Sequence, residues 1–526
     1  NGREPPAHSR TRPDAVRPMP ANRRLAPEQT NDLVHYLREE SFREQNPTQY
    51  SEVDDASLAS LPKGRKHGGG LAESDELPDR DWGPALASQL GDDVGACLTV
   101  RLAKQVSIAY DLQVMESPGA WTGGFLDLSK TQHYQQRGEG RAQPSGTMLS
   151  GLEGFGWGHG GALDWDRSVR PERGPLPKEL LEHRGHFLHG RDVVLSYAVD
   201  GRGVLERPGL DASAGLPVIT HRIRVEAGEA PLVLGLCRTP AGATGVDTIY
   251  SEADSDDGYL PWNLIALGTP SGEDLAPFAA AAVLGNGRLE LDDAGRVLLR
   301  IPASDAPQDF YVLRLASRDA AALEGFELML DNLREAPLPP SPAKQTAGGP
   351  SRWGEELVTS GALGDQAPYA LDTVALPESN PWDAWIRTSA LDFFEDGRAA
   401  LSTYGGDVWI VSGLDGDLDE VRWRRFAAGM FEPMGVRVVD GLVYVTCRDR
   451  ITRLHDLNDD GEADFYESFF ADPDVSPNFH AFNFDLQTDA EGAFYYAKSG
   501  QYTDFALPGG ILKVAPDGSG YDVYCT

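Results

Sequence analysis

The sequence has 526 residues, of which 24% are charged, and its formal net charge at pH 7 is −34. This acidity argues against a nucleic-acid partner, because phosphate binding needs clustered Lys and Arg side chains. The length predicts roughly two to four domains, and the sequence has no run of about 18 apolar residues that would predict a membrane span.

The N-terminal piece, residues 1–60, contains one predicted helix from Pro27 to Phe42. Pro27 suits the first helical turn, Glu28 complements the positive end of the helix dipole, and the apolar residues that follow keep helical spacing. A helix this short cannot bury its apolar face alone. We therefore expect either a partner that is missing from this chain or docking of the helix on the central region.

Two segments rich in Gly, Pro and charged residues, 61–80 and 336–355, are predicted as linkers. Between them, residues 81–335 contain many short runs that alternate apolar and polar residues, separated by turn signals. This pattern predicts a central β-sandwich. One helix is predicted near its end, over Ser317 to Arg334.

Three histidines of the central region, His183, His186 and His189, are spaced three apart. On a helix their nitrogens could converge on zinc or copper. Gly185 and Gly190 make a helix unfavourable here, so the preferred interpretation is a loop that leads into the next strand. The cysteines of the chain form no CxxC or CxxCH motif, which excludes a thiolate zinc site of the usual spacing and a covalent haem site.

The C-terminal region, residues 356–526, carries a repeat. Gly397, Gly441 and Gly492 each precede a strand-like run, at spacings of 44 and 51 residues. These spacings are typical of β-propeller blades. About three blades are present, fewer than the four or more that usually close a ring, so we expect an incomplete propeller and a chain that is a fragment of a longer protein.

Residues 456–467, DLNDDGEADFYE, match a twelve-residue calcium loop position by position. The preceding residues are β-branched and aromatic, so the loop is predicted to join two strands rather than two helices. The alternative is an acidic surface turn without metal. The predicted ligands are Asp456, Asn458, Asp460, the backbone carbonyl of Glu462, Asp464 and Glu467.

Three C-terminal segments, 409–415, 423–435 and 448–464, resemble the opening blades of bacterial propellers related to soluble glucose and sorbosone dehydrogenases. That resemblance implies pyrroloquinoline quinone on the propeller face beside calcium, and a histidine that takes a proton from the sugar alcohol. His480, in NFHAFNFDL, stands at a place similar to that catalytic histidine; a packed core histidine is the alternative. The family's cofactor-binding Lys and Arg residues come later in the ring and are absent from this sequence.

The first 65 or so residues resemble the end of a class I cytochrome c. In this resemblance Met19, in Pro-Met-Pro, corresponds to the distal haem ligand, and the Pro27 helix to the last cytochrome helix. Without the resemblance, Met19 would be an ordinary packing residue. The central region, through residues 121–127 and 184–197, resembles an uncharacterised module of the same modular proteins, which implies no activity.

These features predict a mainly β chain with a cytochrome c remnant, a sandwich and a partial propeller. The expected function is that of a fragment of a periplasmic or secreted quinoprotein-type dehydrogenase, with calcium in this chain and haem c and the quinone in the full-length parent. Its partners would be a sugar or small alcohol and an electron-accepting cytochrome. Two alternatives stay open: a non-catalytic cell-envelope protein that binds glycans or proteins, and a calcium-dependent lactonase-like hydrolase.

Overall fold

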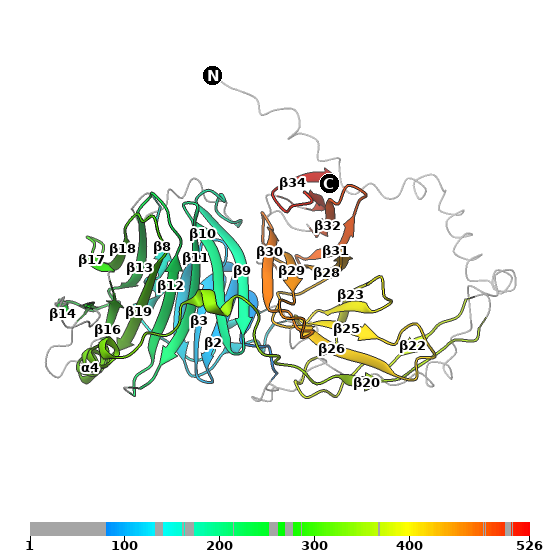
Figure 1. Ribbon diagram of the computed structural model, residues 1–526, viewed down its shortest axis with the longest axis horizontal. Helices are drawn as coiled ribbons and strands as arrows, with labels where there is room; N and C mark the ends of the chain where they lie inside the picture. Colours follow the sequence, from blue (N-terminus) through cyan, green and yellow to red (C-terminus); the bar gives the residue numbers. More distant parts are fainter. Residues whose placement is uncertain are drawn as a thin grey trace, which may run out of the picture. The chain divides into compact units, whose positions relative to one another are not determined.

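Figure 1 shows the computed structural model of the chain. The expectations for the N-terminal piece, including the Pro27 helix and Met19, lie outside the described residues. The described residues are mainly β, as expected, and they all belong to one compact unit. The structure describes residues 80–525 except 132–139, 160–162, 164–172, 214, 252–260, 269–276, 286, 367–368, 477, 479, 500–506 and 508.

The central region contributes to three main sheets. One has the order β1-β2-β3-β4-β7, with bounds Ala85–Leu90, Val94–Ala103, Val106–Asp111, Glu116–Thr122 and Thr147–Met148. Another has the order β17-β18-β13-β8, with bounds Arg288–Leu291, Arg296–Ile301, Leu232–Arg238 and Gly156–Trp157. The short strands β5 (Leu126–Asp127) and β6 (Gln143–Pro144) pair beside them, and η2 (Leu152–Gly154) is a turn of 3-10 helix.

The third sheet has twelve strands and connects the central and C-terminal regions. Its order is β14-β15-β16-β19-β12-β11-β10-β9-β30-β29-β28-β27. The central strands are β14 Val246–Ser251, β15 Trp262–Leu267, β16 Phe278–Leu284, β19 Gln308–Ser317, β12 Val218–Val225, β11 Arg202–Asp211, β10 Asp192–Val199 and β9 Leu181–His189. The C-terminal strands are β30 Phe465–Ala471, β29 Arg450–His455, β28 Leu442–Thr446 and β27 Gly435–Val439.

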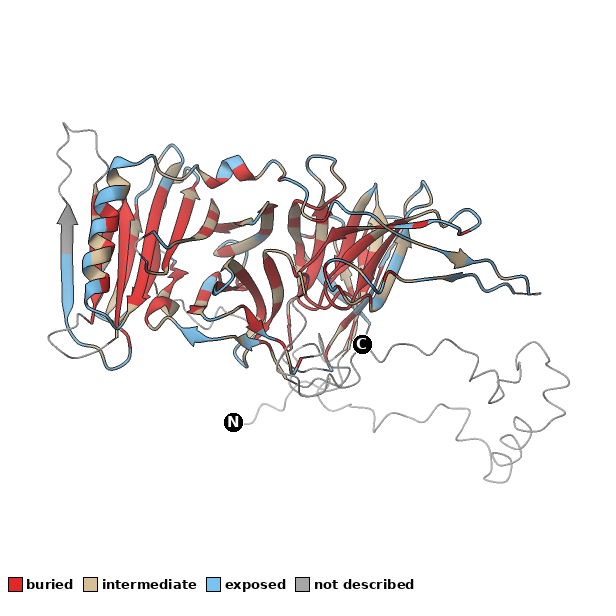
Figure 2. Ribbon diagram, turned by 90° about the horizontal axis from the view of Figure 1, so that it is seen from below, coloured by how far each residue is buried: buried red, intermediate tan, exposed pale blue. Residues whose placement is uncertain are grey.

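The three sheets bury one continuous apolar core, shown as the red interior strands of Figure 2. It contains Leu98 and Ile108 of the first sheet, Leu234 of the second, and Leu195 and Ile223 of the twelve-stranded sheet, all fully buried. Burial of each such side chain stabilises the fold by about 1.5–3 kcal/mol. The alternating runs of the sequence therefore correspond to strands with one face in this core.

The helix α4, Ala321–Glu335, confirms the predicted helix within the usual uncertainty of a few terminal residues. Phe326, Met329 and Leu330 lie on its buried side, as spacings of three and four residues require. They pack with Trp262 and Phe278 of the twelve-stranded sheet in a second, separate core.

The C-terminal region contains three consecutive four-stranded antiparallel units: β23–β26, β27–β30 and β31–β34. The repeat glycines Gly397, Gly441 and Gly492 lie between the first and second strands of these units and all have positive φ, of 86°, 78° and 85°. The remaining bounds are β23 Thr388–Phe393, β24 Ala399–Thr403, β25 Val408–Ser412, β26 Val421–Ala427, β31 Asn483–Thr488, β32 Phe494–Lys498, β33 Gly510–Val514 and β34 Tyr521–Cys525.

The strands β20 (Leu357–Thr359), β21 (Gly361–Ala362) and β22 (Thr373–Val374) precede these units, and β20 extends the first unit by pairing with β26. The segment predicted as a linker, 336–355, contains the 3-10 helix η4 (Pro342–Gln345) and the buried Trp353, which is 1% exposed. Strand pairing between β9 and β30 also connects the regions on either side of this segment.

Candidate binding pocket

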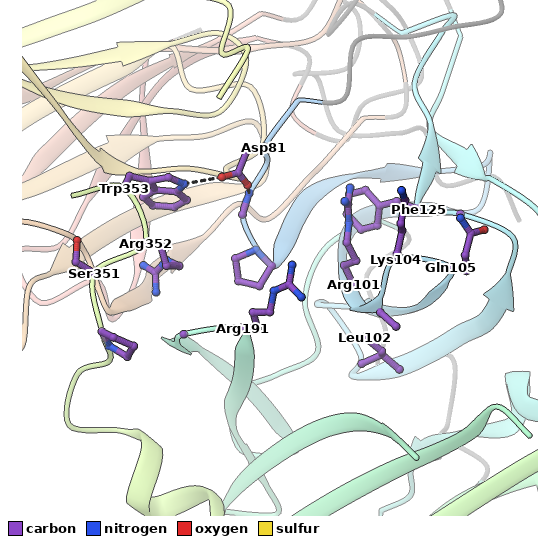
Figure 3. A pocket seen from close by; sticks show the side chains of 16 residues that line it. Asp81, Arg101, Leu102, Lys104, Gln105, Phe125, Arg191, Ser351, Arg352 and Trp353 are labelled. Atoms are coloured by element: carbon purple, nitrogen blue, oxygen red, sulfur yellow. Dashed lines mark hydrogen bonds between the residues drawn. The ribbon is translucent and has the colours of Figure 1, made fainter. Parts of the chain in front are cut away.

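One cavity has a volume of about 770 Å³ and is lined by five chain segments. Two come from the first sheet: the β2–β3 hairpin, residues 101–105, and the loop after β4, residues 124–125. The others are the segment before β1, the β9–β10 turn at 190–191, and residues 350–353. Figure 3 shows Arg352 and Trp353 on one wall, with Arg101 and Lys104 on the opposite one.

The side chains around this cavity are mainly cationic. Arg101, Lys104, Arg191 and Arg352 all line it, whereas Asp81 is the single acidic residue among the described lining residues. The Asp81 carboxylate accepts hydrogen bonds from the indole N–H of Trp353, at 2.8 Å, and from the backbone N–H of Gly83, also at 2.8 Å. A chain with a net charge of −34 therefore has a locally positive cavity.

Aromatic rings orient two of the cations. The guanidinium carbon of Arg352 lies 4.9 Å from the Trp353 ring centroid, and that of Arg101 lies 4.4 Å from the Phe125 ring centroid. Such cation–π contacts hold a planar guanidinium in place, which prepares it for a two-point contact with a carboxylate or phosphate. Trp353 also contacts Arg425, at 4.7 Å, so its ring supports arginines rather than offering an open stacking face.

Residues 456–464 of the predicted calcium loop connect β29 and β30, and its last three residues are the start of β30. Its first half is closed by its own side chains: Asp456 accepts the N–H groups of Asp460 (3.1 Å) and Gly461 (2.7 Å), and Asp460 accepts the N–H of Glu462 (3.0 Å). Asn458 accepts a further bond from the Asp460 N–H, at 3.2 Å. Gly461 has a φ of 81°, the left-handed conformation expected at the sharp turn.

The other predicted calcium ligands bind different partners. The Glu467 carboxylate lies 2.6 and 2.7 Å from Arg453 nitrogens and 2.6 Å from His455 Nε2. Burial opposes its ionisation, but hydrogen bonds from His455 and Arg453 outweigh this effect and lower its pKa. Asp464 instead accepts the backbone N–H groups of Gly349 (2.8 Å) and Leu457 (2.9 Å).

Glu462, whose backbone carbonyl is the predicted ligand, is 1% exposed. Its carboxylate accepts bonds from the segment 351–353, which forms one wall of the cavity. Throughout the described part of the chain, no group of three or more His, Cys, Asp and Glu side chains is placed so as to hold a metal ion. Calcium binding by the loop stays a prediction, and it would require Glu467 to leave Arg453.

His480 lies exposed in the segment between β30 and β31. Its backbone N–H donates to Asn478 Oδ1 at 3.0 Å, and its carbonyl accepts from Ser499 Oγ at 3.1 Å. Strand β30 lies between the 456–467 loop and this segment along the chain. The role of His480 as a catalytic histidine stays a prediction.

A network of buried charges lies near His480. The Lys498 ammonium is 2.6 Å from Asp472, and the Arg448 guanidinium is 2.9 Å from Glu432. Arg448 also donates to the carbonyls of Ser476 and Asn478, and so it holds the segment that carries His480. Each of the two buried cations thus forms an ion pair with a buried carboxylate.

The preferred interpretation of His183, His186 and His189 as a loop was wrong, because all three belong to strand β9. Each has a different partner: His183 Nδ1 is 2.7 Å from Arg450, the His186 ring stacks on Tyr466, and His189 Nδ1 is 2.9 Å from the Gly348 carbonyl oxygen. Burial and the charge of Arg450 lower the pKa of His186 to about 3. The bulge opposite Ser196 and the pairing with β30 were not visible in local sequence.

The cations of the pocket were not identified from the sequence. These four cations come from three separate segments, and each lies beside a turn or within an irregular segment that carries no motif. The only available signal was local: the cationic hairpin at 101–104, and the Gly-Arg turn at 190–191, stand out in a strongly acidic chain.

Residues 108–206 match the model of a protein family described as a domain of unknown function, DUF6797. This range includes the β9–β10 turn of the pocket. No curated protein matches the chain. Among the described residues, no helix is both long and apolar enough to cross a membrane.

Two solved structures show weak similarity. One is described as a kojibiose phosphorylase from the human microbiome, with 9% identity over 49% of this chain and 36% of that chain, and a TM-score of 0.20. The other is an α-galactosidase from Lactobacillus brevis, with 9% identity over 43% of this chain and 40% of that chain, and a TM-score of 0.20. The chain thus spans less than half the length of either, and similarity at this level carries no argument about fold or function.

Proposed function

We propose that this chain is a non-catalytic binding protein of the cell envelope that takes an anionic glycan into the cationic cavity. The observation that carries the proposal is the gathering of four cationic side chains around one cavity in a protein whose net charge is −34. In this proposal the stacked central sheets form a β-sandwich and the three four-stranded units form part of a propeller.

The size and chemistry of the cavity define the ligand class. A volume of about 770 Å³ falls in the range of about 300–1,000 Å³ typical of small-molecule sites. It is much larger than one phosphate or sulfate ion, and the cations lie on separate segments. A ligand with several anionic groups, such as an oligosaccharide of uronic acids, would match this distribution. Guanidinium groups bind carboxylates by two parallel hydrogen bonds.

Titration calorimetry with a galacturonic acid tetrasaccharide tests the proposal. We expect saturable binding of this ligand and no binding of a neutral cellotetraose. Arg352→Gln should lower the affinity about tenfold or more, since a hydrogen bond to a charged group contributes about 1.5–3 kcal/mol. Lys344→Gln, which removes an exposed charge of η4 outside the cavity, is the matched control.

Equal binding of the neutral and acidic sugars would contradict the proposal. So would an affinity for the acidic sugar that is reduced as much by Lys344→Gln as by Arg352→Gln. Inorganic phosphate serves as a further probe: if it competes fully at similar concentration, the cavity recognises a compact anion rather than a glycan.

The second candidate is the quinoprotein-type dehydrogenase of sugars or alcohols. Its support is the exposed position of His480 in the segment that Arg448 holds. The quinone, when bound in a full-length parent, would accept the electrons of the substrate, and His480 would take the proton of the alcohol. Haem c, with Met19 as a ligand, and an electron-accepting cytochrome belong to the same proposal.

Alcohol-dependent dye reduction by the full-length parent, reconstituted with calcium and quinone, tests this second candidate. His480→Ala should abolish the reduction, while dye reduction that persists in this variant would exclude the proposed role. Calcium binding by the 456–467 loop is tested separately: Asp460→Ala should lower the melting temperature in calcium more than in chelator. An equal shift in both conditions would leave an acidic turn.

A further inference from the structure

We propose that Glu462 is the positioning residue of the cationic cavity: its buried carboxylate fixes the wall that carries Arg352. This inference rests on the proposed function for its effect on ligand binding. The contacts that support the positioning role of Glu462 do not involve the ligand. The positioning role and the proposed glycan binding can therefore be refuted separately.

Three hydrogen bonds converge on the Glu462 carboxylate. Oε1 accepts from Ser351 Oγ at 2.5 Å and from the Trp353 backbone N–H at 2.6 Å, and Oε2 accepts from the Arg352 backbone N–H at 2.7 Å. The side chain is 2% exposed, which strengthens each bond relative to bonds in water. One carboxylate thus satisfies donors from three successive residues of the wall.

Neighbouring contacts fasten the same wall at other points. Asp464 accepts the Gly349 N–H, and Asn458 Nδ2 donates to the Gly349 carbonyl at 2.7 Å. At the opposite side, the Trp353 indole N–H donates to Asp81, which belongs to another wall of the cavity. The β29–β30 loop therefore holds the segment 349–353 in place, although the sequence pattern of the loop predicts a metal site.

The position of Arg352 follows from this arrangement. Its Nη2 donates to the Ala463 carbonyl at 3.1 Å and lies 3.9 Å from Glu462 Oε2, while its guanidinium rests on the Trp353 ring. The backbone on both sides of the Arg352 side chain is thus tied to Glu462. Because a bidentate contact demands a fixed guanidinium direction, a loosened wall should weaken anion binding without removing any cation.

Glu462→Gln tests the inference with little change in shape. Glutamine has one acceptor oxygen instead of two, and its amide N–H groups would face wall donors, so at least one of the three bonds is lost. We expect the affinity for the galacturonic acid tetrasaccharide to fall about fivefold to tenfold. Glu153→Gln is the control, because Glu153 also binds a backbone N–H, that of Gly151, and an arginine, Arg238, outside the cavity.

A double-mutant cycle with Arg352→Gln separates positioning from general destabilisation. If Glu462 acts through Arg352, Glu462→Gln should lower the affinity less than about twofold in the Arg352→Gln background. An undiminished effect there, or an equal loss of affinity in Glu153→Gln, would overturn the inference.

Amide hydrogen exchange supplies a readout that needs no ligand. Exchange of the Arg352 and Trp353 amides should quicken in Glu462→Gln and stay unchanged in Glu153→Gln. Should Glu462→Gln not fold, Ser351→Ala removes one of the three donors and should produce a smaller change in the same direction. If the wild-type protein binds no acidic sugar while the two variants show this exchange pattern, the proposed function alone is refuted. Unchanged exchange in Glu462→Gln would refute the positioning role.

Discussion

Arg352 shows what the sequence can and cannot reveal about a single residue. Spacing within 456–467 indicated the residue types of a calcium loop, and the glycine turn at 461 is present. Spacing does not indicate which way a side chain points, and Glu462 and Glu467 both bind groups outside the loop. The partners of Glu462 lie about 110 residues earlier in the chain, so the role of Arg352 depends on a contact that no local pattern contains.

A second buried cluster, in the central core, also connects distant residues. The Glu206 carboxylate accepts hydrogen bonds from Tyr110 (2.7 Å), Tyr197 (2.6 Å) and His221 Nδ1 (2.7 Å), and Arg314 Nε donates to His221 Nε2 at 3.0 Å. Because Nε2 accepts from a guanidinium, His221 is neutral with its proton on Nδ1. Burial, together with the Arg314 charge, lowers its pKa to about 4.

This cluster predicts an acid-labile fold. In the unfolded chain His221 takes up a proton as the pH falls below about 6.5, whereas the folded protein resists protonation until about pH 4. The unfolded state then binds more protons, so stability is complete above pH 6.5 and is lost as the pH falls through this window. Burial also lowers the pKa of His183 and of His186, so both add to the loss of stability at acidic pH.

Denaturant unfolding between pH 6 and 4.5 measures this dependence. His221→Gln should be less stable than wild type at pH 7, yet its free energy of unfolding should fall less steeply with decreasing pH. Without the titration of His221, the free energy of unfolding should change by about 1.4 kcal/mol less per pH unit than in wild type. Parallel curves for the two proteins would show that His221 is already charged in the folded state.

At the scale of elements, the sequence predicted the parts that are determined locally. The helix α4 and the three turn glycines of the four-stranded units follow from spacing alone. The local pattern did not predict strand β9, which pairs along its length with β10 and over three residues with β30, nearly 280 residues later in the chain. Gly185, which argued against a helix there, instead allows the Tyr466 backbone to approach closely.

Gly185→Ala tests this close approach. Gly185 has a φ of 132°, and a Cβ atom built on it would lie 2.3 Å from the Tyr466 carbonyl oxygen. We expect a loss of roughly 3 kcal/mol in the free energy of unfolding, from backbone strain combined with displacement of β30. Gly201→Ala has a positive φ of 76° but nothing within 4 Å of its Cβ, so it should cost about 1 kcal/mol. Equal losses in the two variants would show that the contact contributes nothing beyond the φ penalty.

At the scale of the whole chain, composition and local electrostatics point in opposite directions. A net charge of −34 predicts repulsion of anions at long range, yet four cationic side chains and one acidic side chain are among the described residues that line the cavity. At physiological ionic strength, charges more than about 8 Å apart are largely screened. In the proposed function the local charge of the cavity therefore outweighs the total charge of the chain, and total charge alone did not reveal this.

The most direct test is a crystal structure of the protein soaked with the galacturonic acid tetrasaccharide. We predict that the sugar occupies the cavity, with one carboxylate about 2.7–2.9 Å from Arg352 nitrogens and a second in contact with Arg101, Lys104 or Arg191. Sugar bound elsewhere, or a cavity without sugar at a concentration that saturates binding in solution, would contradict the account.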